Sequence, residues 1–205
     1  MNIVEPSVEV YFDKRPIDIY KNIERAGRVC YKSEPKITDN SYEGFIRNLL
    51  KRGHEAVIEH ESISVKIICD RGVTHELVRH RIGSFCQEST RYVNYQTGIN
   101  VIQTPIEDIK LLEKWRSTMC YIEDMYKEMI EGGIRPEIAR SVLPTCLKTE
   151  IMVTFNLREW RHFLKLRLSK AAHPQMRQIA KMILDTFMHN IPLFFEDIQE
   201  TYGSL

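Results

Sequence analysis

Residues 62–69 have the sequence SISVKIIC, and residues 150–155 have the sequence EIMVTF. In the first stretch Ile63, Val65 and Ile67 occupy alternate positions, which is the period of a strand with one buried face. The second stretch has the β-branched and aromatic composition of a strand. The segments around them have helical periodicity, and the strands are too few and too irregular for a regular βαβ series. The sequence therefore predicts an α+β fold.

The remaining elements follow from hydrophobic periodicity and from Gly and Pro positions. Pro6 cannot donate to a strand ladder, so residues 2–12 are expected to form an edge strand or a bent one. Residues 92–104 are expected to form short extended pieces broken at Gly98. Helices are predicted over 18–30, 42–52, 73–82, 107–132, 157–168 and 174–198, with a short one after Arg135-Pro136, and the apolar stripe of 107–132 (Leu112, Trp115, Met119, Ile122, Tyr126, Met129) is expected to be core. No repeat or linker divides the chain, so residues 1–205 are expected to form one domain.

Composition excludes several classes of protein. The 205 residues include 29 Lys and Arg and 28 Asp and Glu, a net charge of +1, so no overall basic field attracts nucleic acid or an anionic membrane. No apolar run approaches the roughly 20 residues of a bilayer helix, and acids lie near the N-terminus, so we expect a cytoplasmic protein. Five cysteines without a C-x-x-C pair predict reduced thiols and neither a disulfide nor a zinc cluster. An anion site must then be local.

Standard motifs for metal and nucleotide binding are incomplete. His75-Glu76 would need a second histidine at the position of Arg79 to form H-E-x-x-H. The glycines form neither G-x-G-x-x-G nor a phosphate loop. A nucleotide cofactor would therefore bind without a Rossmann fingerprint, and no metal site is expected.

The most informative segment begins at Arg79-His80-Arg81 and ends at Arg91-Tyr92. Three arginines and a histidine fall within thirteen residues, together with hydroxyls at Ser84, Ser89 and Thr90. Such donors suit phosphate or carbonyl-rich rings. An exposed basic turn that pairs with surface acids is the alternative. Consecutive Arg-His-Arg at a predicted helix end points in three directions, which better suits a junction between chains or ligands.

These residues resemble the signature of the flavin-dependent thymidylate synthases. The matching positions are Arg79-His80-Arg81, Ser84, Ser89, Arg91 and Tyr92 in the signature, Gly53-His54-Glu55 with Glu59-His60 upstream, and Arg140 in IARSVLP, Asn156-x-Arg158, Leu166-Arg167 and His173 downstream. They extend from residue 53 to residue 173 in the family's order. The chain departs from the pattern at Ala56, Cys86, Gln87 and His162, where hydrogen bonds to flavin and nucleotide would change, although Gln87 and His162 can still donate and accept.

The resemblance implies a fold and a reaction. It implies a small, mostly antiparallel sheet surrounded by helices. The implied reaction is the reductive methylation of dUMP to dTMP, with 5,10-methylenetetrahydrofolate as carbon donor and NADPH as reductant of FAD. It further implies a homotetramer with FAD sites shared between subunits, with no nucleic-acid or membrane partner. No cysteine nucleophile is implied, and Cys86 is expected to be a packing or flavin-edge residue.

The resemblance also implies residue roles. Arg167 would activate the uracil, a task that suits a guanidinium because it stays charged at any working pH; judged alone, Arg167 would be assigned to a solvated helix face. The implied substrate residues are Glu76, Arg79, Gln87, Glu88, Ser89, Thr90, Arg91, Arg140 and Arg167. The implied cofactor residues are His54, Glu59, Arg79, His80, Arg81, Gln87, Asn156, Arg158 and His162.

Two other functions stay open at this stage. An RNA-binding module would use Arg79, Arg81 and Arg91 with stacking by Phe85, Tyr92 and Tyr95, although the near-zero net charge weighs against it. A flavoprotein of the same scaffold could instead methylate another pyrimidine nucleotide.

Overall fold

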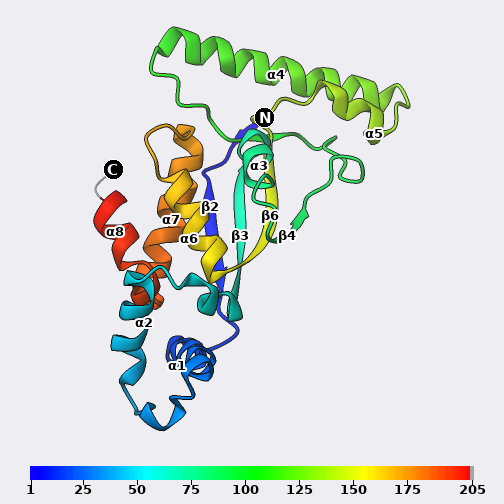
Figure 1. The fold of residues 1–205 in the computed structure, drawn as a ribbon. Helices are drawn as coiled ribbons and strands as arrows, with labels where there is room; N and C mark the ends of the chain where they lie inside the picture. Colours follow the sequence, from blue (N-terminus) through cyan, green and yellow to red (C-terminus); the bar gives the residue numbers. More distant parts are fainter. Residues whose placement is uncertain (204–205) are drawn as a thin grey trace. The chain divides into compact units, whose positions relative to one another are not determined.

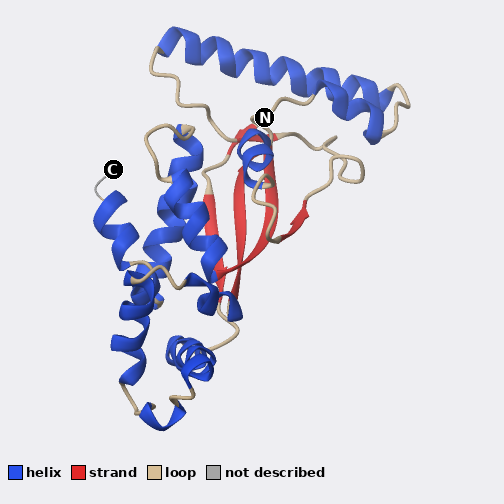
Figure 2. Ribbon diagram, in the orientation of Figure 1, coloured by secondary structure: helices blue, strands red, loops and turns tan. Residues whose placement is uncertain are grey.

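The computed structural model describes residues 1–203 and has the predicted α+β composition (Figure 1, Figure 2). The strands are β1 (Asn2–Ile3), β2 (Ser7–Tyr11), β3 (Ser62–Asp70), β4 (Ser84–Gln87), β5 (Asn100–Val101) and β6 (Lys148–Asn156). The helices are α1 (Pro16–Arg28), α2 (Ser41–Lys51), α3 (Arg71–Leu77), α4 (Ile109–Glu131), α5 (Pro136–Ala139), α6 (Leu157–Arg167), α7 (Pro174–Asn190) and α8 (Glu196–Tyr202). Short 3-10 turns are η1 (Val29–Tyr31), η2 (Glu34–Lys36), η3 (Glu55–His60), η4 (Arg140–Val142) and η5 (Pro192–Phe194). No helix in this described part is long and apolar enough to cross a membrane.

The main sheet has the strand order β2-β3-β6-β4. Its two long strands, β3 and β6, are antiparallel, because Arg71 N donates to Leu147 O (3.1 Å) at one end and Leu157 N donates to Glu61 O (2.9 Å) at the other. β1 pairs in parallel with β5 in a separate two-stranded sheet. The predicted small and mostly antiparallel sheet is therefore confirmed.

The chain divides into two compact units, and the long strands run from one into the other. The first unit comprises Met1–Ser7, Ile67–Arg79 and Cys86–Ile151. The second unit comprises Val8–Lys66, His80–Phe85 and the described part of Met152–Leu205. The expectation of a single domain stays a prediction.

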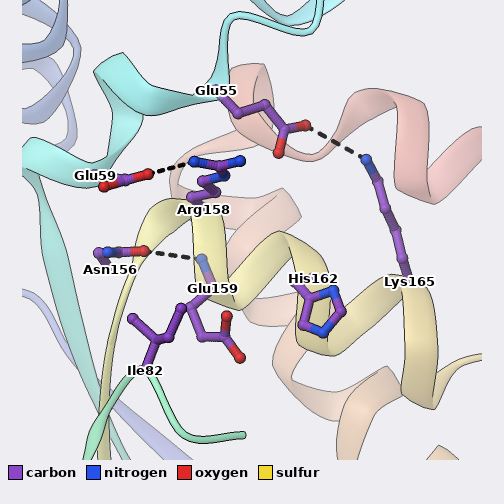
Figure 3. Close-up of a pocket in the computed structure, with 8 residues that line it drawn as sticks. All are labelled: Glu55, Glu59, Ile82, Asn156, Arg158, Glu159, His162 and Lys165. Carbon is purple, nitrogen blue, oxygen red and sulfur yellow. Dashed lines mark hydrogen bonds and ion pairs between the residues drawn. The ribbon is translucent and has the colours of Figure 1, made fainter.

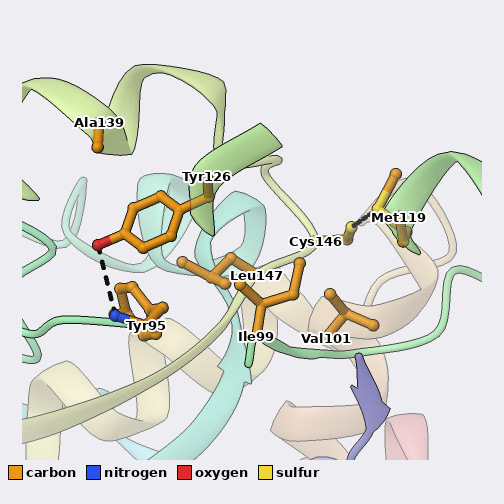
Figure 4. Close-up of a cluster of buried hydrophobic side chains, with 8 residues drawn as sticks. All are labelled: Tyr95, Ile99, Val101, Met119, Tyr126, Ala139, Cys146 and Leu147. Atoms are coloured by element: carbon orange, nitrogen blue, oxygen red, sulfur yellow. Dashed lines mark hydrogen bonds between the residues drawn. The ribbon is translucent and has the colours of Figure 1, made fainter. Parts of the chain in front are cut away.

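The core of the first unit lies beneath α4 (Figure 4). Met119 and Tyr126 from the predicted stripe are buried in it, and Trp115, Ile122 and Met129 pack against it as partly buried side chains. The other buried members are Tyr95, Ile99, Val101, Ala139, Cys146 and Leu147. Five of the six residues of the predicted stripe on 107–132 thus belong to this core, whereas Leu112 does not, and the core also contains Tyr95 and Ile99 from the segment that follows the cationic signature.

The core of the second unit is built from aromatic rings of β6 and α6. Phe155 lies 4.7 Å from Trp160 between ring centroids, and Trp160 contacts Phe163 and Phe187 edge to face. Trp160 Nε1 also donates to Ile63 O at 3.0 Å, which satisfies the buried indole N–H. These contacts attach α6 to the sheet and so fix the direction of its exposed side.

Two predictions of secondary structure were wrong, and one strand was not predicted. The helix expected over 73–82 ends at Leu77, so Arg79-His80-Arg81 lies in a turn and not at a helix end. Residues 84–87 form a strand that polar residues had concealed, and Gly83 permits its approach because a Cβ there would lie 2.1 Å from Phe155 Cδ1. The helix over 174–198 is interrupted because Pro192 has no N–H to continue it.

Two weaker expectations were met in part. Within 92–104 only Asn100–Val101 is a strand, and Gly98 adopts a positive φ of 126°, consistent with a break there. All five cysteines are free, and Cys86 is exposed and therefore not a packing residue.

Candidate functional site

The predicted site residues divide between the two units. The first unit holds Glu76, Arg79, Gln87, Glu88, Ser89, Thr90, Arg91 and Arg140. The second unit holds His54, Glu59, His80, Arg81, Asn156, Arg158, His162 and Arg167. Most implied substrate residues thus lie in one unit and most implied cofactor residues in the other, with Arg167 the main exception.

A cavity of about 510 Å³ lies at the start of α6 in the second unit (Figure 3). Four predicted cofactor residues line it: Glu59, Asn156, Arg158 and His162. Glu55, Ile82, Glu159 and Lys165 complete the lining. The structure therefore brings together residues that lie about a hundred positions apart in the sequence.

The sequence at the junction of β6 and α6 explains this placement. Asn156 has extended backbone and caps α6, because its side-chain oxygen accepts from Glu159 N at 2.9 Å. Arg158 and His162 are four residues apart and so share a helix face, as predicted. The first turn of α6, with its partial positive charge, therefore borders a cavity that carries cationic side chains.

Two of the three acids that line this cavity, Glu59 and Glu55, are paired with cations. Glu59 Oε1 lies 2.5 Å from Arg158 Nη1, and both side chains are about half exposed. Glu55 Oε1 accepts from Arg161 Nε (3.1 Å) and Lys165 Nζ (3.5 Å). An exposed pair such as Glu59–Arg158 contributes only about 0–1 kcal/mol, so an anionic ligand can exchange with Glu59 for the guanidinium.

His80 is buried, with 4% of its surface exposed, and both ring nitrogens are hydrogen-bonded. Arg167 Nε donates to His80 Nε2 at 3.1 Å, which leaves the proton on Nδ1, and Nδ1 lies 3.0 Å from Glu159 Oε1. Burial lowers the pKa of His80, and the Arg167 charge adds to this effect, whereas the hydrogen bond that the ring donates to Glu159 opposes it. Because Nε2 accepts from a guanidinium, the ring is in its neutral form, and Glu159, His80 and Arg167 are joined by two consecutive hydrogen bonds.

His80, Glu159 and His162 also form a group with the residue types of a metal site. Ligand-type atoms of His80, Glu159 and His162 lie within 4.8 Å of one another. Both nitrogens of His80 are engaged, however, and the Arg167 guanidinium lies against the ring. A metal ion that bound His80 would have to replace one of these hydrogen bonds and would be repelled by the Arg167 guanidinium. The three side chains are therefore better suited to hydrogen bonding than to metal binding.

In the first unit the predicted substrate residues from 87 to 90 form local hydrogen bonds. Gln87 Nε2 donates to Thr74 Oγ1 (3.0 Å) and Thr149 Oγ1 (3.2 Å). Glu88 accepts from Tyr95 Oη at 2.7 Å, and burial, followed by this carboxylate, raises the pKa of that phenol. The side chains of Gln87 and Glu88 are thus oriented by the protein itself.

The predicted site arginines of the first unit are exposed. Arg140 Nη1 donates to Thr90 Oγ1 at 3.1 Å, which joins two predicted substrate residues. Arg91 lies over the ring of Tyr92, with its guanidinium carbon 5.4 Å from the ring centroid. Arg79 is exposed, as is Arg81 in the second unit. Solvent-facing guanidinium groups flank the buried His80 in sequence, so the three residues of the motif differ in environment.

His54 does not line the cavity at α6. It lines a different cavity of about 630 Å³ in the second unit, together with Arg28, Arg52 and Phe45 among others. Its predicted role in cofactor binding stays a prediction, as do those of Glu76, Ser89 and the other residues named above.

The sequence analysis missed Glu159 as a functional residue. A carboxylate three residues after an N-cap asparagine has a structural explanation, namely the first turn of a helix. The signal that it has a second role is its contact with His80, 79 residues earlier in the chain. Such a contact is visible only once β6 and α6 are placed against residue 80.

The family described as "Thymidylate synthase complementing protein" matches residues 17–193. A "Flavin-dependent thymidylate synthase" of Pyrococcus furiosus is 36% identical over 188 residues, which is 86% of this chain and 76% of that protein. One of Geobacter sulfurreducens is 33% identical over 183 residues, which is 84% of this chain and 78% of that protein. A solved structure titled as a UMP/dUMP methylase PolB from Streptomyces cacaoi bound with 5-Br dUMP has a TM-score of 0.81 at 22% identity, covers 100% of this chain and 99% of its own, and shows that the fold is shared.

Proposed function

The chain belongs to the thymidylate synthase complementing protein family, and from that premise we propose that it is a flavin-dependent thymidylate synthase that methylates dUMP to dTMP. The observation that carries the proposal is that Glu59, Asn156, Arg158 and His162 line one cavity. The first three match the family's pattern, and His162 occupies a position of that pattern with a different residue. Methylenetetrahydrofolate would supply the carbon, and NADPH the electrons.

The donors at the start of α6 fit a flavin nucleotide. Arg158, His162 and Lys165 present cations or hydrogen-bond donors, and the helix N-terminus adds partial positive charge, which suits an anionic group such as a pyrophosphate. Bound FAD would carry electrons from NADPH to the methylation. Ile82 offers an apolar contact on the same lining. Arg79, His80 and Arg81 are the other proposed flavin residues. His80 would act by orienting Arg167, and the two exposed arginines would attract the negative charge of the flavin nucleotide.

Arg167 is the proposed catalytic residue. Carbon 5 of uracil becomes nucleophilic when negative charge is stabilised at nitrogen 3 and the adjacent carbonyls, and a guanidinium supplies that stabilisation. Arg167 is half-buried, and its Nε is fixed on His80, so its fork is already oriented. Preorganisation of this kind avoids reorganisation during the reaction.

The first unit supplies the proposed nucleotide contacts. Arg91 and Arg140 would bind the anionic phosphate, because exposed guanidinium groups make bidentate contacts to it. Ser89, Thr90, Gln87, Glu88 and Glu76 would contact the sugar and base. Thr90 is already joined to Arg140, which couples the two parts of this surface.

We also propose a homotetramer in which subunits share each FAD, and a cytoplasmic location. Sharing would explain why the cationic residues of one chain are distributed over separate groups. Light scattering with flavin absorbance checks the assembly: a flavin-loaded monomer would contradict sharing.

The function is tested by tritium release from dUMP labelled at carbon 5. The reaction contains FAD, NADPH and methylenetetrahydrofolate, and each is omitted in turn. Release that needs all three supports the proposal. A flavin-loaded protein that releases no tritium from dUMP, but does so from labelled UMP, would show that the scaffold acts on another pyrimidine nucleotide.

A further inference from the structure

We propose that Glu159 is a positioning residue that acts through His80 to fix the orientation of the Arg167 guanidinium. This inference rests on the proposed function, because the task assigned to Arg167 is taken from there. Glu159 itself need not touch the substrate. Its effect is transmitted along Glu159 Oε1, His80 Nδ1, His80 Nε2 and Arg167 Nε, with separations of 3.0 and 3.1 Å.

The hydrogen-bonding rules of the three groups allow only one arrangement. An ionised carboxylate only accepts, and a guanidinium N–H only donates. The imidazole between Glu159 and Arg167 must therefore donate from Nδ1 and accept at Nε2. Glu159 thus selects the tautomer of His80, and the tautomer in turn presents a lone pair to Arg167. With the opposite tautomer, two N–H groups would face each other at 3.1 Å.

Fixing one N–H of an arginine orients the rest of the group. The guanidinium is planar, so the direction of Nε–H also sets the plane of the two terminal NH2 groups. These are the groups that recognise planar ligands in a bidentate way. The chain from Glu159 therefore controls the part of Arg167 that would meet the uracil.

The surrounding side chains hold the hydrogen-bonded residues Glu159, His80 and Arg167 in place. His80 is 4% exposed and Glu159 is 8% exposed. The His80 ring lies edge-on to Phe163 at 5.1 Å and near Phe155 at 6.0 Å between centroids. Hydrogen bonds in such a low-dielectric place are stronger than in water, and water does not compete for them.

The decisive variant is Glu159→Gln. Glutamine keeps the size of the side chain, but its amide can donate as well as accept, so it no longer dictates the tautomer of His80. We expect turnover of dUMP to fall about tenfold, the scale of losing an outer partner of a functional group. KM for dUMP should change less than kcat, and flavin content and melting temperature should stay at wild-type values. Asp185→Asn, which removes one exposed carboxylate on α7, is the matched control and should leave turnover unchanged.

A double-mutant comparison separates positioning from a purely structural role. If Glu159 acts through Arg167, Glu159→Gln should cost little further turnover in an Arg167→Ala background. A tenfold loss in both backgrounds would overturn the inference. Residual turnover of Arg167→Ala sets the baseline for this measurement.

A second readout does not depend on dUMP. Nitrogen-15 NMR of labelled histidine distinguishes the two neutral tautomers, and His80→Gln assigns the signal. We expect the Nδ1–H form in the wild type and a mixture in Glu159→Gln. An Nε2–H ring in the wild type would overturn the inference whatever the substrate is, so its failure is distinguishable from failure of the proposed function.

Discussion

The two groups of predicted site residues are held in different ways. In the second unit, His80 is nearly inaccessible, and Asn156 caps the helix that carries the exposed side chains of Arg158 and His162. In the first unit, side chains such as Gln87 are tied to neighbouring hydroxyls, whereas Arg91 and Arg140 remain exposed. The proposed cofactor residues of the second unit thus combine one buried ring with exposed side chains on a capped helix, whereas the proposed phosphate contacts of the first unit are both exposed. Substitution of a buried charged group should therefore cost stability, whereas substitution of an exposed site residue in either unit should change ligand affinity.

The largest expected effect is that of Arg161→Ala in the second unit. Arg161 has a side chain that is only 1% exposed, and it donates to both oxygens of Asp197 at 2.7 Å and to Glu55. Burial alone would raise the pKa of Asp197, but Arg161 lowers it, so both acids depend on this cation. Removing it should lower the free energy of unfolding by about 3 kcal/mol, because it leaves a cavity and takes the donor from Phe194 O, whereas Asp197 is about half exposed and can be hydrated.

Urea denaturation checks this value, and Arg47→Ala is its control. Arg47 pairs with Glu196 on the same helix α8, but its side chain is about half exposed. That variant should cost at most about 1 kcal/mol. Equal losses in the two variants would show that burial does not distinguish these pairs.

The next effect concerns the proposed catalytic arginine. Arg167→Ala should retain flavin and the fold but lose about 10²–10³-fold in turnover, as expected when one preorganised donor to a developing negative charge is removed. Tritium release from dUMP measures it. Turnover near that of the wild type would refute the assignment of Arg167.

A paired substitution tests the division between the units directly. Arg158→Ala should weaken flavin binding about tenfold and leave the affinity for dUMP nearly unchanged, because Arg158 lines the cavity at α6. Arg140→Ala, joined to Thr90, should do the reverse. Flavin and dUMP titrations of both variants decide the matter, and parallel losses of both ligands in each variant would mean that the two groups serve one ligand.

The sequence predicted those elements in which side-chain period and burial agree. The alternation of Ile63, Val65 and Ile67 correctly predicted β3, and the apolar stripe containing Met119 and Tyr126 correctly predicted the core beneath α4. Periodicity failed where a close approach decides the structure. Residues 84–87 are too few and too polar to indicate a strand, and their pairing depends on the space that Gly83 leaves beside Phe155.

The candidate site was predictable in composition but not in connectivity. The motif around residue 80 was expected to present three cationic side chains at a helix end. In the structure the helix stops at Leu77, and His80 turns inward to Glu159 while Arg79 and Arg81 face solvent. Adjacent residues acquire opposite environments because only His80 packs against Phe163 and Glu159 of α6. No local pattern of residues carries that information.

The smallest expected effect is on the pH dependence of stability, through His80. Burial lowers the pKa of this ring in the folded protein, and Glu159, Arg167 and His162 are the charged or titratable groups near it. Because the folded pKa is depressed, the neutral ring stabilises the fold above the unfolded pKa of about 6.5, and this stabilisation is lost as pH falls toward the folded pKa. The free energy of unfolding should therefore decrease between pH 7.5 and pH 5.5, with at most about 1.4 kcal/mol per pH unit from this one proton.

Two variants check the origin of this pH dependence. In His80→Gln the free energy of unfolding should depend less steeply on pH, whereas His189→Gln, which alters an exposed histidine, should keep the wild-type dependence. If His80→Gln also kept the wild-type slope, His80 would not be the group that resists protonation, and the buried chain from Glu159 to Arg167 would lose its physical basis.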